Sequence, residues 1–110
     1  MWEIKEPTKT FGERLKYMGS EYIDEIIDSE HCIYRELPNG ANFEISGANN
    51  NKIATLSMSV YVWCRTSFTI EQIHKIKSMD ALKNTLEDLV AKYALFTHDE
   101  LYSMRHPTPI

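Results

Sequence analysis

The chain has few cysteines and no excess of basic residues. Its 110 residues include two cysteines, too few to suggest a disulfide framework. Lysine and arginine together number 12 against 16 aspartates and glutamates, which gives a formal net charge of −4. A generic nucleic-acid binder needs clustered basic side chains, so this balance disfavours nucleic acid as a partner.

Long apolar runs and an apolar leader are also missing. No stretch approaches the roughly 20 apolar residues that a membrane-spanning helix requires, and the opening residues 1–6 are polar and mixed. We therefore expect a cytoplasmic protein without a membrane partner. The length and the 43% of hydrophobic residues suit one domain over 1–110, with loose ends at about 1–9 and 105–110.

Apolar residues with helical spacing predict a first helix. The stripe runs through residues 11–27, and Thr10 with Glu13 has the spacing of a capping box. The pair Gly19-Ser20 is a weak point at which this helix could kink or restart.

A second and clearer helix is predicted near the C-terminus. Ser78 precedes a regular three-four apolar repeat over residues 79–96, as an N-cap residue would. Thr97 and Glu100 again have capping-box spacing, which indicates a short final helix.

Alternating side chains between the two helices predict strands. We expect strands at 31–37, 41–46 and 54–63, and we favour a strand over a helix for 67–77. The turn 38–40 is a hairpin signal because its glycine can take a positive φ. The fold class is therefore α+β, an antiparallel three- to four-stranded β-meander with an N-terminal and a C-terminal helix packed on one face.

Loop lengths predict the strand register. A three-residue turn pairs Leu37 with Ala41, Arg35 with Phe43 and Ile33 with Ile45, and a four-residue turn at 48–51 then sets Ile45 opposite Ala54. This places Arg35 on the helix-covered face, where a helix carboxylate such as Asp24 or Glu25 could pair with it.

The same register places large aromatic side chains on the other face of the sheet. Tyr34, Tyr61 and Trp63 lie there with Glu36 and Glu44. Aromatic side chains with a polar tip are enriched where proteins contact partners, so these five residues are the candidate binding site. The alternative is that Tyr61 and Trp63 are covered by the N-terminal arm around Trp2 or by the C-terminal tail. The acidic neighbours argue against base stacking.

Residues with catalytic or metal-binding chemistry are few and lack a motif. No nucleophile elbow, Walker loop or dinucleotide-binding glycine run is present, so we expect no enzyme and no cofactor. His31, Cys32, Cys64 and His74 supply metal-ligand atoms but lack metal-site spacing, and adjacent strand residues such as His31 and Cys32 point to opposite faces. A metal site there is the weaker alternative to two cysteines that act as small apolar residues.

Three segments resemble those of small accessory proteins carried by phages and prophages. These are the sequences NFEISG at 42–47, YVW at 61–63 and KSMDAL at 77–82. Proteins of this kind include stoichiometric inhibitors of bacterial defence enzymes, the anti-CRISPR proteins among them. The resemblance thus implies an inhibitor that acts in the host cytoplasm.

Together these observations lead to a functional hypothesis with alternatives. The sequence predicts a non-enzymatic protein-binding domain, and the resemblance narrows it to an inhibitor of a bacterial defence protein. The alternatives are a small-ligand or metal-binding domain and a homo-oligomeric accessory subunit, for example a homodimer.

Overall fold

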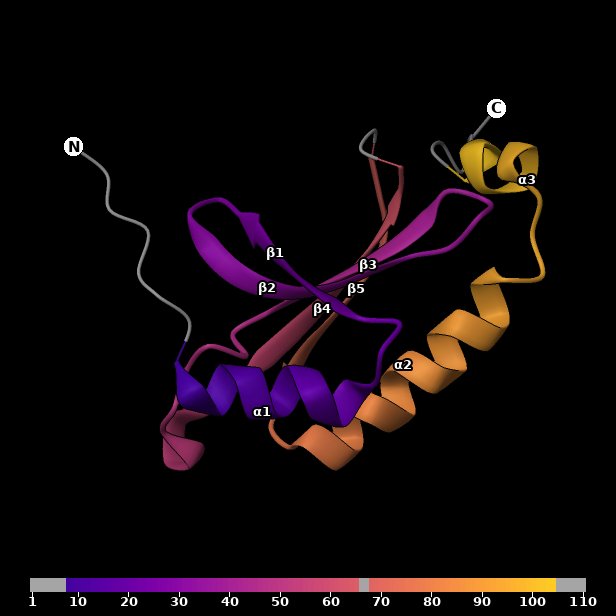
Figure 1. The fold of residues 1–110 in the computed structure, drawn as a ribbon. Helices are drawn as coiled ribbons and strands as arrows, with labels where there is room; N and C mark the ends of the chain where they lie inside the picture. Colours follow the sequence, from indigo (N-terminus) through magenta and orange to yellow (C-terminus); the bar gives the residue numbers. More distant parts are fainter. Residues whose placement is uncertain (1–7, 66–67, 105–110) are drawn as a thin grey trace.

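A five-stranded antiparallel sheet is the centre of the fold (Figure 1). The computed structural model describes residues 8–65 and 68–104. Its elements are α1 (Lys9–Met18), β1 (Ile23–Ile27), β2 (Glu30–Glu36), β3 (Ala41–Ser46), the 3-10 helix η1 (Ile53–Thr55), β4 (Met58–Cys64), β5 (Phe68–Ile76), α2 (Met79–Tyr93) and α3 (His98–Ser103). The strands follow one another in sequence order across the sheet, as in a meander. The α+β class with helices on one face is confirmed, and the sheet has one strand more than expected.

Both long helices lie on the same side of the sheet (Figure 1). Phe11 of α1 and Leu82 and Leu86 of α2 are almost fully buried, as are Phe43 and Val62 on the sheet face beneath them. Burying side chains of this size stabilises the fold by about 1.5–3 kcal/mol each. The core therefore lies between the helices and one face of the sheet, and none of the described helices lies on the opposite face.

The two C-terminal helices begin where their caps predict. The Ser78 hydroxyl accepts a hydrogen bond from the amide of Ala81 at 3.1 Å and caps α2. Thr97 and Glu100 form a complete capping box at the start of α3. Leu101 of this short helix is fully buried, so α3 belongs to the packed core.

The first helix is shorter than its apolar stripe suggested. Thr8, rather than Thr10, caps it by accepting a hydrogen bond from the Phe11 amide at 2.9 Å. The helix ends at Met18, because Gly19 follows with a φ of +113°. The prediction of a helix through residue 27 is wrong, since 23–27 form β1, where β-branched isoleucines are favoured.

The turn between β1 and β2 explains how this strand was missed. Asp28 and Ser29 have φ values of +52° and +64°, and positive φ at both central residues is what a type I′ hairpin turn requires. Asp-Ser supplies this conformation without the glycine that usually signals it.

The register confirms the β2–β3 hairpin and corrects the next one. Ile33 pairs with Ile45 and Arg35 with Phe43, as predicted. Ile45 then pairs with Val60 rather than with Ala54, because residues 47–57 form a longer connection that contains η1. The observed partner of Ile45 is an even number of residues from the predicted one, so the side chains of β4 keep their predicted faces.

In the segment 67–77, for which we favour a strand, residues 68–76 form the strand β5. Its pairing with β4 contains two irregularities, and Lys75 has a φ of +63°. The expected loose end at 1–9 is corrected at Thr8 and Lys9, which belong to the start of α1. The rest of the expected loose ends, 1–7 and 105–110, lies outside the described residues.

Candidate functional site

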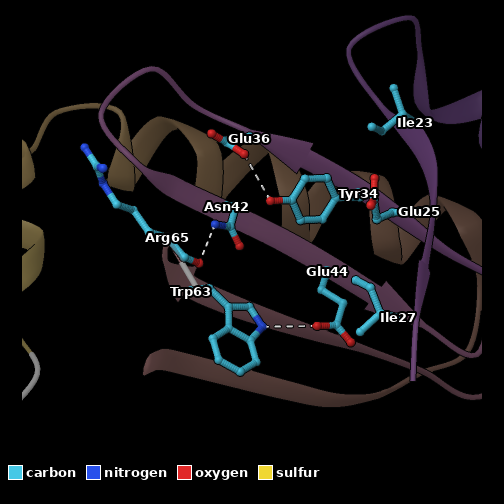
Figure 2. A pocket seen from close by; sticks show the side chains of 9 residues that line it. All are labelled: Ile23, Glu25, Ile27, Tyr34, Glu36, Asn42, Glu44, Trp63 and Arg65. Atoms are coloured by element: carbon cyan, nitrogen blue, oxygen red, sulfur yellow. Dashed lines mark hydrogen bonds between the residues drawn. The ribbon is translucent and has the colours of Figure 1, made fainter. Parts of the chain in front are cut away.

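A pocket of about 500 Å³ lies on the sheet face opposite the two long helices (Figure 2). We call it the open-face pocket. It is lined by Ile23, Glu25, Ile27, Tyr34, Glu36, Asn42, Glu44, Trp63 and Arg65. The lining thus includes Tyr34, Glu36, Glu44 and Trp63 of the predicted binding site. The remaining predicted residue, Tyr61, lies outside the lining, and its ring contacts His74 edge-on with centroids 5.7 Å apart.

Strand pairing arranges the centre of this face as a small grid. The side chains form two rows across β2, β3 and β4, namely Tyr34–Glu44–Tyr61 and Glu36–Asn42–Trp63. Neighbouring strands are about 4.8 Å apart, so side chains within a row are in direct reach of one another. One carboxylate, that of Glu44, therefore lies between two tyrosines.

Each aromatic side chain of the pocket is held by a carboxylate. The hydroxyl of Tyr34 donates to Oε1 of Glu36 at 3.2 Å, and the indole Nε1 of Trp63 donates to Oε1 of Glu44 at 3.1 Å (Figure 2). These hydrogen bonds fix the orientation of rings that are still partly exposed. The side chains of the sheet themselves thus position both rings.

The electrostatic environment of the pocket is negative. Burial raises the pKa of Glu44 above its ordinary value of 4.5. The hydrogen bond from Trp63 opposes this shift, and the nearby charges of Asp28 and Glu30 add to it. Burial, together with the charge of Glu36, raises the pKa of Tyr34 to about 12. The parts of these shifts that come from neighbouring carboxylates show that additional negative charge is disfavoured here.

Asn42 anchors the floor of the pocket. Its side chain is only 3% exposed, and its Nδ2 donates to the backbone carbonyl of Arg65 at 2.7 Å. Among the lining residues that the structure describes, Arg65 alone carries a guanidinium, and Figure 2 shows it directed away from Trp63 and Glu44.

The contribution of β1 was missed by the sequence analysis. Ile23, Glu25 and Ile27 line the pocket from this strand, which the apolar stripe had assigned to a helix. The signal that could have revealed it is the glycine at the end of α1 together with an isoleucine-rich segment followed by Asp-Ser. The alternative prediction, that the Trp2 arm or the C-terminal tail covers Tyr61 and Trp63, concerns segments that lie outside the described residues.

The four candidate metal ligands do not come together. The ring of His31 lies beneath α1 against Phe11, whereas Cys32 lies on the opposite face of the same strand. Cys64 is on the core side of β4 and pairs with Phe68. Within residues 8–65 and 68–104, no group of three or more His, Cys, Asp or Glu side chains could hold a metal ion.

A hydrogen-bonded serine and histidine on β4 and β5 also escaped the sequence analysis. Ser59 Oγ lies 2.8 Å from Nδ1 of His74, and Nε2 of His74 lies 3.2 Å from Oε1 of Gln72. A hydrolytic triad orients its histidine with a carboxylate, which stabilises the imidazolium that forms, and the neutral amide of Gln72 cannot supply that charge. The arrangement is thus better suited to positioning His74 beside Tyr61.

Arg35 and Asp24 have other partners than the predicted ones. The guanidinium of Arg35 lies 5.3 Å from the centre of the Tyr22 ring, as in a cation–π contact. Asp24 instead accepts from Nδ1 of His31 at 2.8 Å, on the helix-covered side of the sheet. The prediction of an Arg35 pair with Asp24 or Glu25 is therefore replaced by the contact with Tyr22.

Comparisons with known proteins add no family to these observations. No protein-family model matches the chain, no curated protein matches it, and no solved structure matches it. Among the described helices, none is both long and apolar enough to cross a membrane. The functional argument therefore depends on the open-face pocket itself.

Proposed function

We propose that this chain is a non-enzymatic protein-binding domain whose open-face pocket contacts the partner. The observation that carries the proposal is the pair of aromatic–carboxylate hydrogen bonds, Tyr34 with Glu36 and Trp63 with Glu44. Both lie on the sheet face that the described helices do not cover. Tyrosine and tryptophan are the residue types that most often anchor protein interfaces.

Preorganisation supports the same function. Fixing an aromatic side chain on binding costs about 0.5–1.5 kcal/mol in lost freedom. Here the two rings are already held by carboxylates, and their strands are paired on both sides. Because less free energy is lost in ordering these side chains, more of the favourable contact free energy contributes to affinity.

The nature of the partner follows from the resemblance to phage accessory proteins. We propose a stoichiometric inhibitor that acts in the bacterial cytoplasm on a defence protein, for example an RNA-guided nuclease of a CRISPR system. This part of the proposal depends on the segments at 42–47, 61–63 and 77–82 and not on the pocket geometry.

The proposal is tested by capture experiments with matched variants. Tagged wild-type protein, Trp63→Glu and Ile53→Glu are incubated with bacterial lysate containing added CRISPR nuclease, and the captured proteins are identified and quantified. Ile53 is 80% exposed in η1 and lies outside the pocket, so it controls for an added surface charge. We expect wild type and Ile53→Glu to retain one partner in stoichiometric amount and Trp63→Glu to lose it. Equal retention by all three folded proteins would contradict the site, and the absence of any partner would contradict the function.

Self-association is the second candidate function, favoured by the edge strand β1. This strand lies at one end of the sheet, and its Ile23 and Ile26 are 50% and 48% exposed. Edge strands of this kind can pair with the same strand of a second copy. Light scattering that finds a dimer, which Ile26→Lys converts to a monomer, would support a homo-oligomeric subunit, whereas a monomer at all concentrations would exclude it.

A further inference from the structure

The open-face pocket has the chemistry of a receptor for a basic side chain. We infer that its occupant is an arginine side chain from a basic segment of the partner protein. The inference rests on the proposed function and adds to it the chemical class of the partner surface.

Charge is the first argument for this occupant. In the part of the chain that the structure describes, the pocket lining has three carboxylates, those of Glu25, Glu36 and Glu44, and one guanidinium, that of Arg65. Figure 2 shows this guanidinium directed away from Trp63 and Glu44. Burial already raises the pKa of Glu44, so its ionised form lacks part of the solvation it would have in water. A cation placed beside it would restore favourable interactions, whereas a phosphate or an acidic peptide would be repelled.

The aromatic and apolar walls are the second argument. Tyr34 and Trp63 offer ring surfaces on which a flat cation can stack, and Ile23 and Ile27 offer apolar contact for an aliphatic stem. A hydrated metal ion would gain nothing from such walls. The lining therefore matches a side chain that has an apolar stem and a charged end.

Geometry favours arginine over lysine among such side chains. The guanidinium is planar, stacks on aromatic rings and donates two parallel hydrogen bonds to a carboxylate. In the pocket each ring is next to the carboxylate that it already binds, so one planar cation can contact a ring and a carboxylate together. The compact ammonium group of lysine can satisfy only one of these contacts well.

Capped pentapeptides test the inference directly. The probes are acetyl-Ala-Ala-Arg-Ala-Ala-amide and the same peptide with lysine or with citrulline, the neutral analogue of arginine. Binding is followed through the indole N–H signal of Trp63 in proton–nitrogen spectra of the labelled full chain, with Trp2→Phe used to distinguish the two tryptophans. We expect saturable shifts with the arginine peptide, weaker shifts with lysine and none with citrulline.

Isosteric variants separate charge recognition from folding. Glu44→Gln and Glu36→Gln keep an oxygen that can accept from Trp63 or Tyr34 but remove the charge, and Glu13→Gln makes the same change on an exposed position of α1. We expect each pocket variant to weaken binding of the arginine peptide by about two- to fivefold, and Glu13→Gln to leave its affinity unchanged. Unfolding curves for every variant show that the comparison is between folded proteins.

The outcomes distinguish this inference from the proposed function. An unmoved Trp63 indole signal at millimolar arginine peptide, or equal shifts with citrulline, would overturn the inference. If the capture experiment nevertheless loses its partner with Trp63→Glu, the proposed function stands and the partner presents different chemistry to the pocket. If the arginine peptide binds as expected and no protein is captured, the pocket chemistry is supported and the protein-binding function fails.

Discussion

The indole of Trp63 donates a hydrogen bond of 3.1 Å to a carboxylate, Glu44, that the fold has partly removed from water. The two residues lie diagonally across β3 and β4, where Glu44 pairs with Tyr61 and Trp63 pairs with Asn42. The hydrogen bond lowers the pKa of Glu44, but burial raises it by more. The carboxylate is thus destabilised in the free protein, which is a common property of residues that a ligand later contacts.

Replacing Glu44 should therefore make the protein more stable. We expect Glu44→Gln to increase the free energy of unfolding at pH 7 by about a few tenths of a kcal/mol, because a half-buried charge is still screened by solvent. The folded pKa lies above the unfolded value, so the ionised carboxylate lowers stability at neutral pH, and this effect disappears as pH falls through the folded pKa. Urea unfolding at pH 7 and pH 3 measures it. A loss of stability at pH 7 would show that Glu44 is a structural residue.

Glu71 should show the opposite dependence on pH. The Tyr93 hydroxyl donates to its carboxylate, and this contact, aided by Lys92, keeps the pKa of Glu71 below its ordinary value. Its contribution to stability is therefore present above the unfolded pKa and is lost as pH falls through the folded pKa. We expect Glu71→Gln to lower the free energy of unfolding at pH 7, with a smaller difference from wild type at pH 3. A variant with the same deficit at both values would contradict the assignment.

Much of the candidate site could be predicted because side chains alternate strictly along strands. Period-two spacing places Tyr34, Glu36, Glu44 and Trp63 on one face. The observed β3–β4 pairing differs from the predicted one by six residues, and because six is even the faces stay the same. What spacing cannot give is which strands neighbour one another at the edge. The wall formed by Ile23, Glu25 and Ile27 was missed because the apolar spacing predicts a helix for residues 23–27, which form β1.

The helix–strand error near the N-terminus has a local physical cause. Isoleucines at 23, 26 and 27 fit a helical stripe as well as a strand, and periodicity cannot separate the two over so few residues. The decisive features are backbone conformations, namely the positive φ of Gly19 and those of Asp28 and Ser29. Of these conformations, only the positive φ of Gly19 is signalled by residue type, because glycine adopts it readily.

The positive φ values in the Asp28–Ser29 turn lead to a prediction about stability. Ser29 has a φ of +64°, which a residue with a Cβ adopts at a cost of about 1 kcal/mol. We expect Ser29→Gly to raise the free energy of unfolding by about 0.5 kcal/mol, after the greater freedom of glycine in the unfolded chain is subtracted. The control is Ser20→Gly, which is not among the positive-φ residues and should be neutral or destabilising. Equal effects of both changes in urea unfolding would argue against the turn.

Replacing two glycines by alanine should change the stability of the fold in opposite directions. Gly47 has a φ of +89°, and a Cβ there would lie 2.5 Å from the backbone oxygen of Ser57, so we expect Gly47→Ala to destabilise the fold by about 2 kcal/mol or more. Gly12 lies inside α1 with nothing within 4 Å of the added Cβ, and Gly12→Ala should stabilise by about 0.5–1 kcal/mol. Thermal unfolding of both variants checks the pair. A harmless Gly47→Ala would mean that the connection 47–57 does not pass close to β4 in this way.

The thiol of Cys32 should be inert, although it lies on the same sheet face as the pocket. Burial, with the charges of Glu30 and Glu44, raises the pKa of Cys32 to about 12, and Cys32 and Cys64 are each only 1% exposed. The thiolate is the reactive form, so at pH 8 we expect no fast reaction with a disulfide reagent in the native protein and two reactive thiols in denaturant. A Cys64→Ser variant should give one thiol in denaturant and none without it. Rapid modification of Cys32 in the folded protein would show that this part of the face is more open than its packing indicates, and it would also revive thiol chemistry as a function of the site.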